Sequence, residues 1–306
     1  YDIYRFGAES SLVWPRIIAP FTFHTSSNFV PKTKLSLSYE FQKRMKLYAL
    51  NSFTATFGYG WKENVLREHN LDIIEVNYIA PSTVTELFEQ QAATNPYDAR
   101  ILSKQLTFGP TYNYIFTNTM LPNKRSTWYF KGSLDLSANL TGLIWGANVD
   151  KDNQKEILGV PFSQYYKIDT DVRFYHKLTS KTSIASRFMA GLAYPYGNSN
   201  EIPFVKQFFV GGTNSVRAFR ARTVGPGSFD PRTSNTSFLL DQAGDIRLEA
   251  NLEYRAKLFS ILEGAVFFDA GNVWLINKNE ARPGGEFSKD FLSEIAVGAG
   301  FGLRAD

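Results

Sequence analysis

The sequence contains no cysteine and only three histidines, which limits the chemistry that its side chains can carry. Without cysteine there is neither a disulfide framework nor a thiolate metal site. The histidines, His24, His69 and His176, lie far apart and form no cluster with the spacing of metal ligands. We therefore expect no metal and no other cofactor.

Long apolar runs are also missing. No stretch approaches the roughly 18 uncharged apolar residues that a transmembrane helix requires, which excludes a helical membrane protein. The mean hydropathy is −0.24, although aromatic residues make up 15% of the chain, with 26 Phe and 16 Tyr. Many aromatics with modest hydropathy are typical of a β-barrel, in which only alternate residues face lipid. On composition alone, a soluble β-rich protein remains equally open.

Neither sign of charge predominates in the sequence, and catalytic motifs are missing. The net charge of +4 comes from 33 basic and 29 acidic residues that are scattered along the chain, whereas a nucleic-acid partner requires clustered basic residues. The segment Gly211-Gly212-Thr213-Asn214-Ser215 lacks the lysine of a phosphate-binding loop. His176 could serve a hydrolase with a nearby serine, but a lone histidine at a strand end is more often structural. We expect no catalytic residues and no enzyme activity.

Alternation of polar and apolar residues with a period of two runs through almost the whole chain. In 245–256 the charged or polar residues share one face and the apolar residues share the other, which indicates a β-strand with two different faces. The pattern predicts eleven strands, at 3–14, 34–46, 50–62, 72–80, 104–117, 128–140, 166–174, 183–194, 245–256, 263–275 and 293–304.

The lengths of these segments favour a membrane. Strands of soluble sheets usually have about 5–6 residues, whereas a tilted strand needs about 9–11 to cross a bilayer. Soluble sandwiches also alternate, but they seldom place three or four charges on one strand face. The sequence therefore predicts an all-β fold, an antiparallel up-and-down transmembrane β-barrel in a bacterial outer membrane.

The connections support this order. The links at 178–181 and 259–262 are short, and long links lie at 81–103, 141–160, 197–243 and 277–291. Such alternation is expected for periplasmic turns and extracellular loops; only 17–31 is long where a short turn is expected. Bacterial single-chain barrels have an even number of strands, and an open sheet in lipid would leave unpaired backbone groups. We therefore expect residues 1–306 to be part of a larger barrel.

The loop at 197–243 has an unusual composition. It contains several phenylalanines, a basic cluster and turn-forming glycines at Gly211, Gly212, Gly225 and Gly227. We predict that it folds back into a wide lumen; an ordered surface loop is the alternative.

The segment Val216-Arg217-Ala218-Phe219 within this loop resembles the Val-Arg-Gly-Phe/Tyr signature of the BamA/TamA outer-membrane protein assembly family, found in that family's sixth extracellular loop. Segments 251–255 and 267–274 resemble the two strands that follow it, and the chain as a whole is most similar to TamA-like members of Bacteroidetes. Ala218 stands where the family has glycine. Alanine would be strained if φ were positive there, so we expect ordinary dihedral angles.

The resemblance implies a fold and a function. It implies a sixteen-stranded barrel in which residues 1–306 form about strands four to fourteen, with POTRA domains upstream. It implies non-enzymatic insertion of outer-membrane β-barrel proteins, or translocation of surface components, through strand pairing at a barrel seam. The partners would be unfolded outer-membrane protein clients, the lipid bilayer and accessory proteins of an assembly complex.

The same resemblance implies that Arg217 reaches Glu253 and Asp269, which alternation places on the lumen face; ordinary lumen charges with water partners are the alternative. Two rival functions remain open. One is a two-partner secretion pore that exports a single dedicated protein, and the other is a solute channel or transporter.

Overall fold

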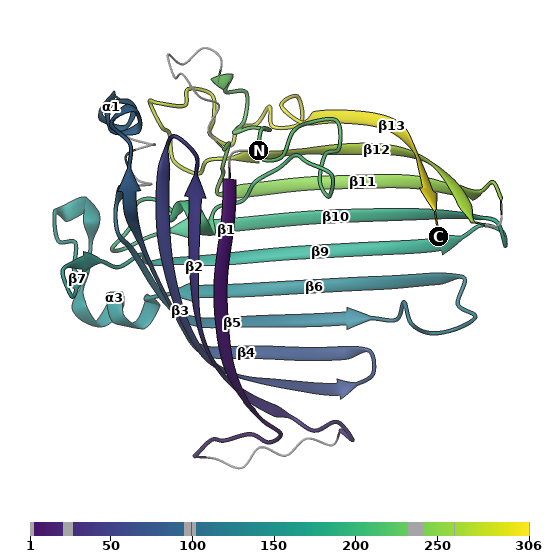
Figure 1. Ribbon diagram of the computed structural model, residues 1–306, viewed down its shortest axis with the longest axis horizontal. Coiled ribbons are helices and arrows are strands. Elements are labelled where there is room, and N and C mark those ends of the chain that lie inside the picture. Colours follow the sequence, from purple (N-terminus) through teal and green to yellow (C-terminus); the bar gives the residue numbers. More distant parts are fainter. Residues whose placement is uncertain are drawn as a thin grey trace. The chain divides into compact units, whose positions relative to one another are not determined.

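A computed structural model describes residues 3–20, 27–94, 99, 102–231, 241–259 and 261–305. Within these residues, one sheet has eleven strands whose hydrogen-bonded neighbours follow chain order, as Figure 1 shows. No helix in the described part of the chain is long and apolar enough to cross a membrane. The strands of the sheet are β1 (Ile3–Trp14), β2 (Lys32–Arg44), β3 (Tyr48–Asn64), β4 (Arg67–Val84), β5 (Gln105–Thr117), β6 (Ser126–Ser137), β9 (Tyr165–Lys177), β10 (Thr182–Pro195), β11 (Ile246–Lys257), β12 (Leu262–Trp274) and β13 (Ala296–Ala305).

All eleven predicted strands are present, which confirms the antiparallel, up-and-down order. Several boundaries were wrong, those of β4 by the most residues. β4 continues well beyond the predicted 72–80, through Pro81, beside which the register with β3 shifts. β6 ends at Ser137 rather than at residue 140, because Ala138 has a φ of 52° and the chain turns there into helix α3 (Asn139–Trp145).

The long links contain secondary structure of their own. Helix α1 (Glu86–Thr94) follows β4, and the link after β6 holds α3, the 3-10 turn η2 (Val149–Lys151) and the small hairpin β7 (Glu156–Ile157) and β8 (Val160–Pro161). A further 3-10 turn, η3 (Phe204–Lys206), opens the loop after β10. The turn at 178–181 is short, as predicted, and the Thr179 hydroxyl accepts hydrogen bonds from the backbone of Lys181 and Thr182.

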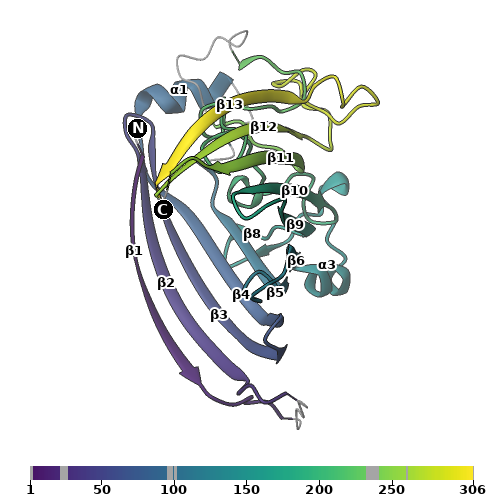
Figure 2. The ribbon, with the colours of Figure 1, turned by 90° about the vertical axis from the view of Figure 1, so that its right-hand side faces the viewer.

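The chain forms two compact units. Unit 1 comprises residues 1–114, 133–167 and 193–206, and unit 2 comprises residues 115–132, 168–192 and 207–306. In unit 1, β1 to β4 pair in sequence, and Figure 2 shows them side by side. Asn77 accepts hydrogen bonds from Ser52 and Thr54 on one face of β3 and β4, while Phe53, on the other face, is half exposed. Unit 1 therefore has a polar sheet face and an apolar one.

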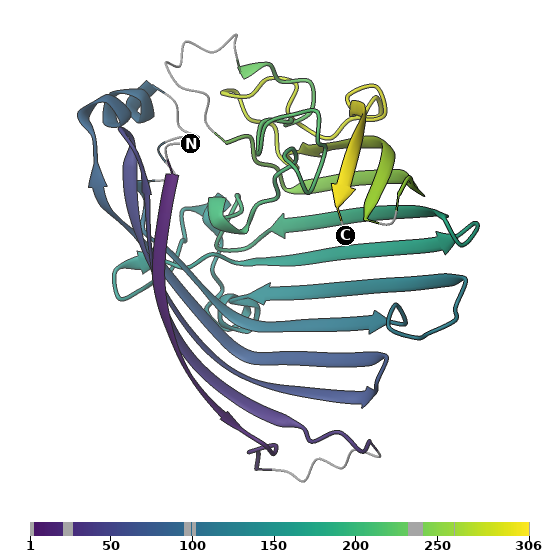
Figure 3. The ribbon, with the colours of Figure 1, turned by 45° about the vertical axis from the view of Figure 1, so that its right-hand side comes forward.

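Unit 2 shows the same division along β11 and β12, which are green in Figure 3. Leu252, Val266 and Phe268 are about half exposed, whereas Glu249 and Asp269 on the opposite face are buried. Soluble proteins place apolar side chains inside and charged ones outside. The reverse arrangement is the one expected of a barrel wall with lipid on its apolar face.

Candidate functional site

Residues 207–230 of the long loop pack on the polar face of the strands in unit 2. Phe208 and Gly244 exchange backbone hydrogen bonds of 2.8 and 3.0 Å, and the Gly227 amide donates to the Val273 carbonyl over 2.8 Å. Val210 forms an isolated β-bridge within the loop and is fully buried. This part of the loop is thus an ordered layer on the sheet.

The four glycines predicted as turn positions all have positive φ. The values are 105° at Gly211, 104° at Gly212, 83° at Gly225 and 52° at Gly227. A side chain at Gly211 would also approach the Arg220 carbonyl to 2.4 Å. L-residues are disfavoured in this backbone region, so the path of the loop depends on these glycines.

Arg217 lies between the two carboxylates predicted as its partners. Its Nε and Nη2 donate to Asp269 Oδ2 and Oδ1, each over 2.8 Å, and its Nη1 donates to Glu253 Oε2 over 2.5 Å. The Arg217 backbone amide also donates to Asp269 Oδ2. The guanidinium carbon lies 3.6 Å from the centre of the Phe267 ring. The hydrogen bond to Asp269 raises the pKa of Arg217, which keeps the guanidinium charged.

The two carboxylates are deeply buried and have further partners. Glu253 accepts hydrogen bonds from Arg217 and Arg255 and forms an ion pair with Arg304 at 2.8 Å. Asp269, with no exposed surface, also accepts from Asn251. Buried charges are tolerated when paired and hydrogen-bonded in this way. Removal of Arg217 would leave Asp269 without its only ion-pair partner among the described residues.

Glycines on the strands make room for the signature segment. A Cβ on Gly271 would lie 3.2 Å from the Val216 side chain, and one on Gly298 would lie 2.6 Å from the Ala218 methyl. Ala218 is not among the described residues with positive φ, in line with the expectation of ordinary dihedrals. Val216 is fully buried, whereas Phe219 is more than a third exposed. Val216 and Arg217 are therefore the more buried half of the signature, whereas Ala218 is exposed apart from its contact with the backbone at Gly298.

A second ionic contact, within unit 1, was not predicted from the sequence. Lys206, at the end of η3, places Nζ 3.1 Å from Glu75 Oε1 on β4 and 2.9 Å from Asp135 Oδ2 on β6. Burial is the largest single influence on its pKa and favours the neutral amine, but Tyr165, Asp135 and Glu75 together outweigh it and raise the pKa. Lys206 therefore remains a cation. It joins the first part of the loop, residues 197–206, which we call the stem of the loop, to β4 and β6 of the sheet.

Charged residues also line a cavity of about 500 Å³ in unit 2 between the loop and β9 to β11. Arg187 donates to both oxygens of Asp171 and to the Asn214 carbonyl of the loop, and Arg247 donates to Asp169. Ser215 donates to Glu249, which is buried. These paired charges add polar contacts between the loop and the sheet.

The histidines do not come together. His176 Nδ1 lies 2.7 Å from Ser126 Oγ, and the described residues place no carboxylate against this pair. His69 contacts Tyr112 and Glu63, and His24 lies outside the described residues. Across the described ranges, no group of three or more His, Asp or Glu side chains could hold a metal ion.

Comparison with known proteins agrees with this architecture. The Omp85 superfamily domain matches residues 19–306. The outer membrane protein assembly factor BamA of Neisseria meningitidis serogroup B is 26% identical over 151 residues, which cover 48% of this chain and 19% of that protein.

Two solved structures share the fold. BamA from Haemophilus ducreyi lacking POTRA domains 1–3 matches 98% of this chain and 56% of its own length, with a TM-score of 0.66 and 16% identity. CdiB from Escherichia coli matches 99% of this chain and 47% of its own length, with a TM-score of 0.52 and 13% identity. The chain therefore spans about half of each of these solved structures, and its matched segment covers about a fifth of the Neisseria protein.

The predicted membership of the BamA/TamA family is thus confirmed at the level of the superfamily, while the TamA-like subtype stays a prediction. Because the family domain matches nearly the whole chain, the chain belongs to the Omp85 superfamily of bacterial outer-membrane β-barrel proteins.

Proposed function

We propose that the protein containing this chain inserts β-barrel proteins into the outer membrane without enzymatic chemistry. The observation that carries the proposal is the clamp that Arg217 forms with Glu253 and Asp269. It fixes the loop as a layer on the polar face, which we take to be the wall of the lumen. A diffusion channel requires an open lumen. A loop that is held against the lumen wall instead stabilises the strands beneath it, as a barrel needs when two of its other strands must separate.

The physical problem of insertion is the unpaired backbone. A client strand that enters lipid exposes N–H and C=O groups, each of which costs several kcal/mol in hydrocarbon. An openable seam between two strands of the barrel offers these groups a pairing edge. The clamp supports this process by keeping β11 and β12 in register with the loop while another part of the barrel opens.

The orientation follows from the lengths of the links. We infer that the long links after β4, β6, β10 and β12 are extracellular and that the short turns after β3, β9 and β11 are periplasmic, as in bacterial barrels. The unfolded clients would arrive from the periplasmic side. We propose accessory assembly proteins as further partners, together with POTRA domains upstream in the full protein.

Depletion of the full-length protein tests the proposal. We expect the amounts of several unrelated outer-membrane β-barrel proteins to fall together. Complementation with the wild-type gene should restore them, and complementation with Arg217→Ala should restore them only in part. The opposing result would be hydrolysis of lipid or peptide by the purified protein that disappears in His176→Ala, because the Ser126–His176 pair would then be catalytic.

A two-partner secretion pore is the second candidate, and the fold shared with CdiB favours it. Such a pore would export one dedicated protein. Its depletion should therefore remove a single protein from the cell surface or the medium and leave the other β-barrel proteins at their normal amounts.

A further inference from the structure

The link between β6 and β9, residues 138–164, does not extend away from the sheet in unit 1 but folds over its apolar face. Val160 and Phe162 from this link are buried in one cluster with Leu106 and Ala138. The cluster also contacts Val76, Tyr78, Phe108 and Ile157, which are partly buried. We call residues 138–164 the outer flap.

The face beneath the outer flap is the one opposite Lys206. Glu75 and Asp135 point toward Lys206 on the polar face. Val76 on β4 follows Glu75 directly, and successive side chains of a strand point to opposite faces. Val76 therefore lies on the apolar face, where the cluster with Phe162 forms.

Backbone and side-chain hydrogen bonds fix the flap in this position. The Ala138 amide donates to the Phe108 carbonyl over 2.7 Å, and the Ser163 amide donates to the Leu106 carbonyl over 2.8 Å. The Asn198 side chain, fully buried, donates to the Phe162 carbonyl over 2.8 Å. The flap is thus bound to β5 at both of its ends and to the start of the long loop.

The surface that the flap turns away from the sheet is apolar. Helix α3 contains no charged residue, and it lies near the ends of β5 and β6 in Figures 1 and 2. The most exposed large apolar side chains of the flap are Leu140 (76%), Leu143 (71%), Ile144 (80%), Trp145 (49%) and Leu158 (98%). Exposed apolar patches of this kind mark interaction surfaces.

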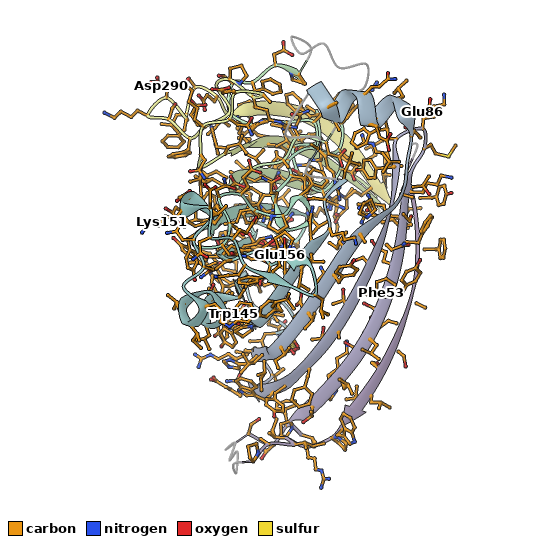
Figure 4. The ribbon with its side chains drawn as sticks, turned by 90° about the vertical axis from the view of Figure 1, so that its left-hand side faces the viewer. Phe53, Glu86, Trp145, Lys151, Glu156 and Asp290 are labelled. Carbon is orange, nitrogen blue, oxygen red and sulfur yellow. The ribbon has the colours of Figure 1, made fainter. Side chains whose placement is uncertain are left out.

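The charged residues of the flap lie apart from α3 in the sequence. Asp150, Lys151 and Asp152 lie in and directly after η2 and are exposed; Lys155, which is partly buried, and Glu156, which is exposed, follow before Leu158. Figure 4 shows Trp145 on α3 and Lys151 at a different part of the flap. Tryptophan is enriched at membrane interfaces, and segments that lie in the interface bury apolar side chains while their charged residues stay toward the headgroups.

We propose that the outer flap inserts α3 and the tip at Leu158 into the acyl region of the outer leaflet, with Asp150–Asp152 and Glu156 at the level of the headgroups. The occupant is lipid because the flap packs on the apolar faces of β4 and β5 and continues them, and the apolar strand face is the one that a barrel turns to lipid. The choice of leaflet rests on the orientation proposed above, whereas insertion itself does not. The flap would fix how deeply this part of the barrel sits in the membrane. It would also displace lipid from beside β4, β5 and β6.

Site-directed spin labelling tests the insertion, because residues 1–306 contain no native cysteine; any cysteine elsewhere in the full-length protein is first replaced by serine. The label is attached to Leu143→Cys in the full-length protein, in vesicles of phosphatidylcholine and phosphatidylglycerol. Lys151→Cys on the same flap serves as the solvent-exposed control, and Phe53→Cys on β3 as the lipid-facing reference. Leu143 is mostly exposed, so its replacement should not disturb the fold.

We expect the label at 143 to collide with oxygen more often than with a water-soluble nickel complex, as at 53, and the label at 151 to show the reverse. A label at 143 with the nickel accessibility of 151 would overturn the proposal. Low accessibility to both reagents, or dipolar broadening between labels, would mean that a partner protein or a second copy covers α3, and would overturn it as well.

Fluorescence gives a second measurement that requires no label. Brominated lipids should quench Trp145, measured as the difference between the wild type and Trp145→Phe. All other tryptophans, four of them in residues 1–306, cancel in this difference. Equal quenching in the two proteins would contradict insertion, whereas failure of the assembly function alone would leave both measurements unchanged.

Discussion

The methyl group of Ala218 occupies the space that a side chain at Gly298 on β13 would need. A methyl group at Gly298 would lie 2.6 Å from the Ala218 Cβ and 3.5 Å from the Ala218 nitrogen. Gly298 also pairs across the strands with Asp269, the main partner of Arg217. The identities of residues 218 and 298 are therefore coupled, and the bare backbone of Gly298 accommodates alanine in the signature.

Gly298→Ala should push the signature segment off the sheet. Crowding of this kind costs roughly 1–3 kcal/mol where the neighbours cannot move. Displacement of the segment should appear as new protease cleavage between Gly211 and Gly227. The double variant Gly298→Ala/Ala218→Gly should suppress this cleavage.

Gly302→Ala is the matched control, because Gly302 lies on the same strand and a methyl group there would meet nothing within 4 Å. Equal protease sensitivity of Gly298→Ala and Gly302→Ala would show that Ala218 does not depend on the space at Gly298.

Arg217→Ala should release the loop while the barrel still forms. The loss leaves the buried Asp269 and Glu253 without the guanidinium between them, and breaking a buried ion pair costs about 3–5 kcal/mol. Arg217→Lys should be intermediate, because an ammonium group cannot replace the planar set of donors. Protease cleavage between Gly211 and Gly227 measures the release.

Arg220→Ala provides the control for this prediction, since Arg220 lies three residues away and is exposed. An Arg217→Ala protein that resists protease as well as Arg220→Ala does would show that other contacts hold the loop.

The sequence predicted the strands because period-two alternation survives in every one of them. Its boundaries failed where the alternation is broken. Along β4 the register with β3 shifts between Phe57 and Gly58 and again between Ala49 and Leu50, where Pro81 pairs. Each irregularity exchanges the two faces of the strand. The alternation therefore predicts a strand that is shorter than the observed Arg67–Val84.

The candidate site was predicted unevenly. Arg217, Glu253 and Asp269 could be named from a motif and from the polar strand faces. Lys206 could not, because its partner Glu75 lies 131 positions away in the sequence and belongs to no motif. The alternation assigns Leu140 to the strand 128–140 and the following residues to the link 141–160. The spacing of Leu140, Leu143 and Ile144 is nevertheless helical and indicates α3.

Arginine at neighbouring positions of β6 should distinguish the two faces of the wall. Leu134→Arg would place a charge on the apolar face, at a cost of roughly 2–4 kcal/mol near the bilayer midplane. Ser133→Arg would place it on the polar face, where Ser133 donates a hydrogen bond to Asn113, and should cost far less. Equilibrium folding into lipid vesicles measures both, and equal costs would mean that the faces are assigned wrongly.

Lys206 should act as an anchor for the stem of the loop, independent of Arg217. Its pKa is raised, so the ammonium form is stabilised in the folded state. This contribution is fully present below the ordinary pKa of lysine and is lost only as the pH rises through the raised value. Lys206→Met leaves Glu75 and Asp135 facing each other without a cation, which should lower the free energy of unfolding by about 3 kcal/mol.

The triple variant Lys206→Met/Glu75→Gln/Asp135→Asn should recover part of this loss, because it also removes the two unpaired carboxylates. Lys151→Met, at an exposed lysine of the outer flap, is the control and should leave stability within about 0.5 kcal/mol of the wild type. Urea unfolding in lipid vesicles compares the four proteins. If Lys206→Met were as stable as Lys151→Met, the contacts of Lys206 with Glu75 and Asp135 would contribute nothing, and other contacts, such as the hydrogen bond from Lys167 to the Lys206 carbonyl, would hold this part of the loop.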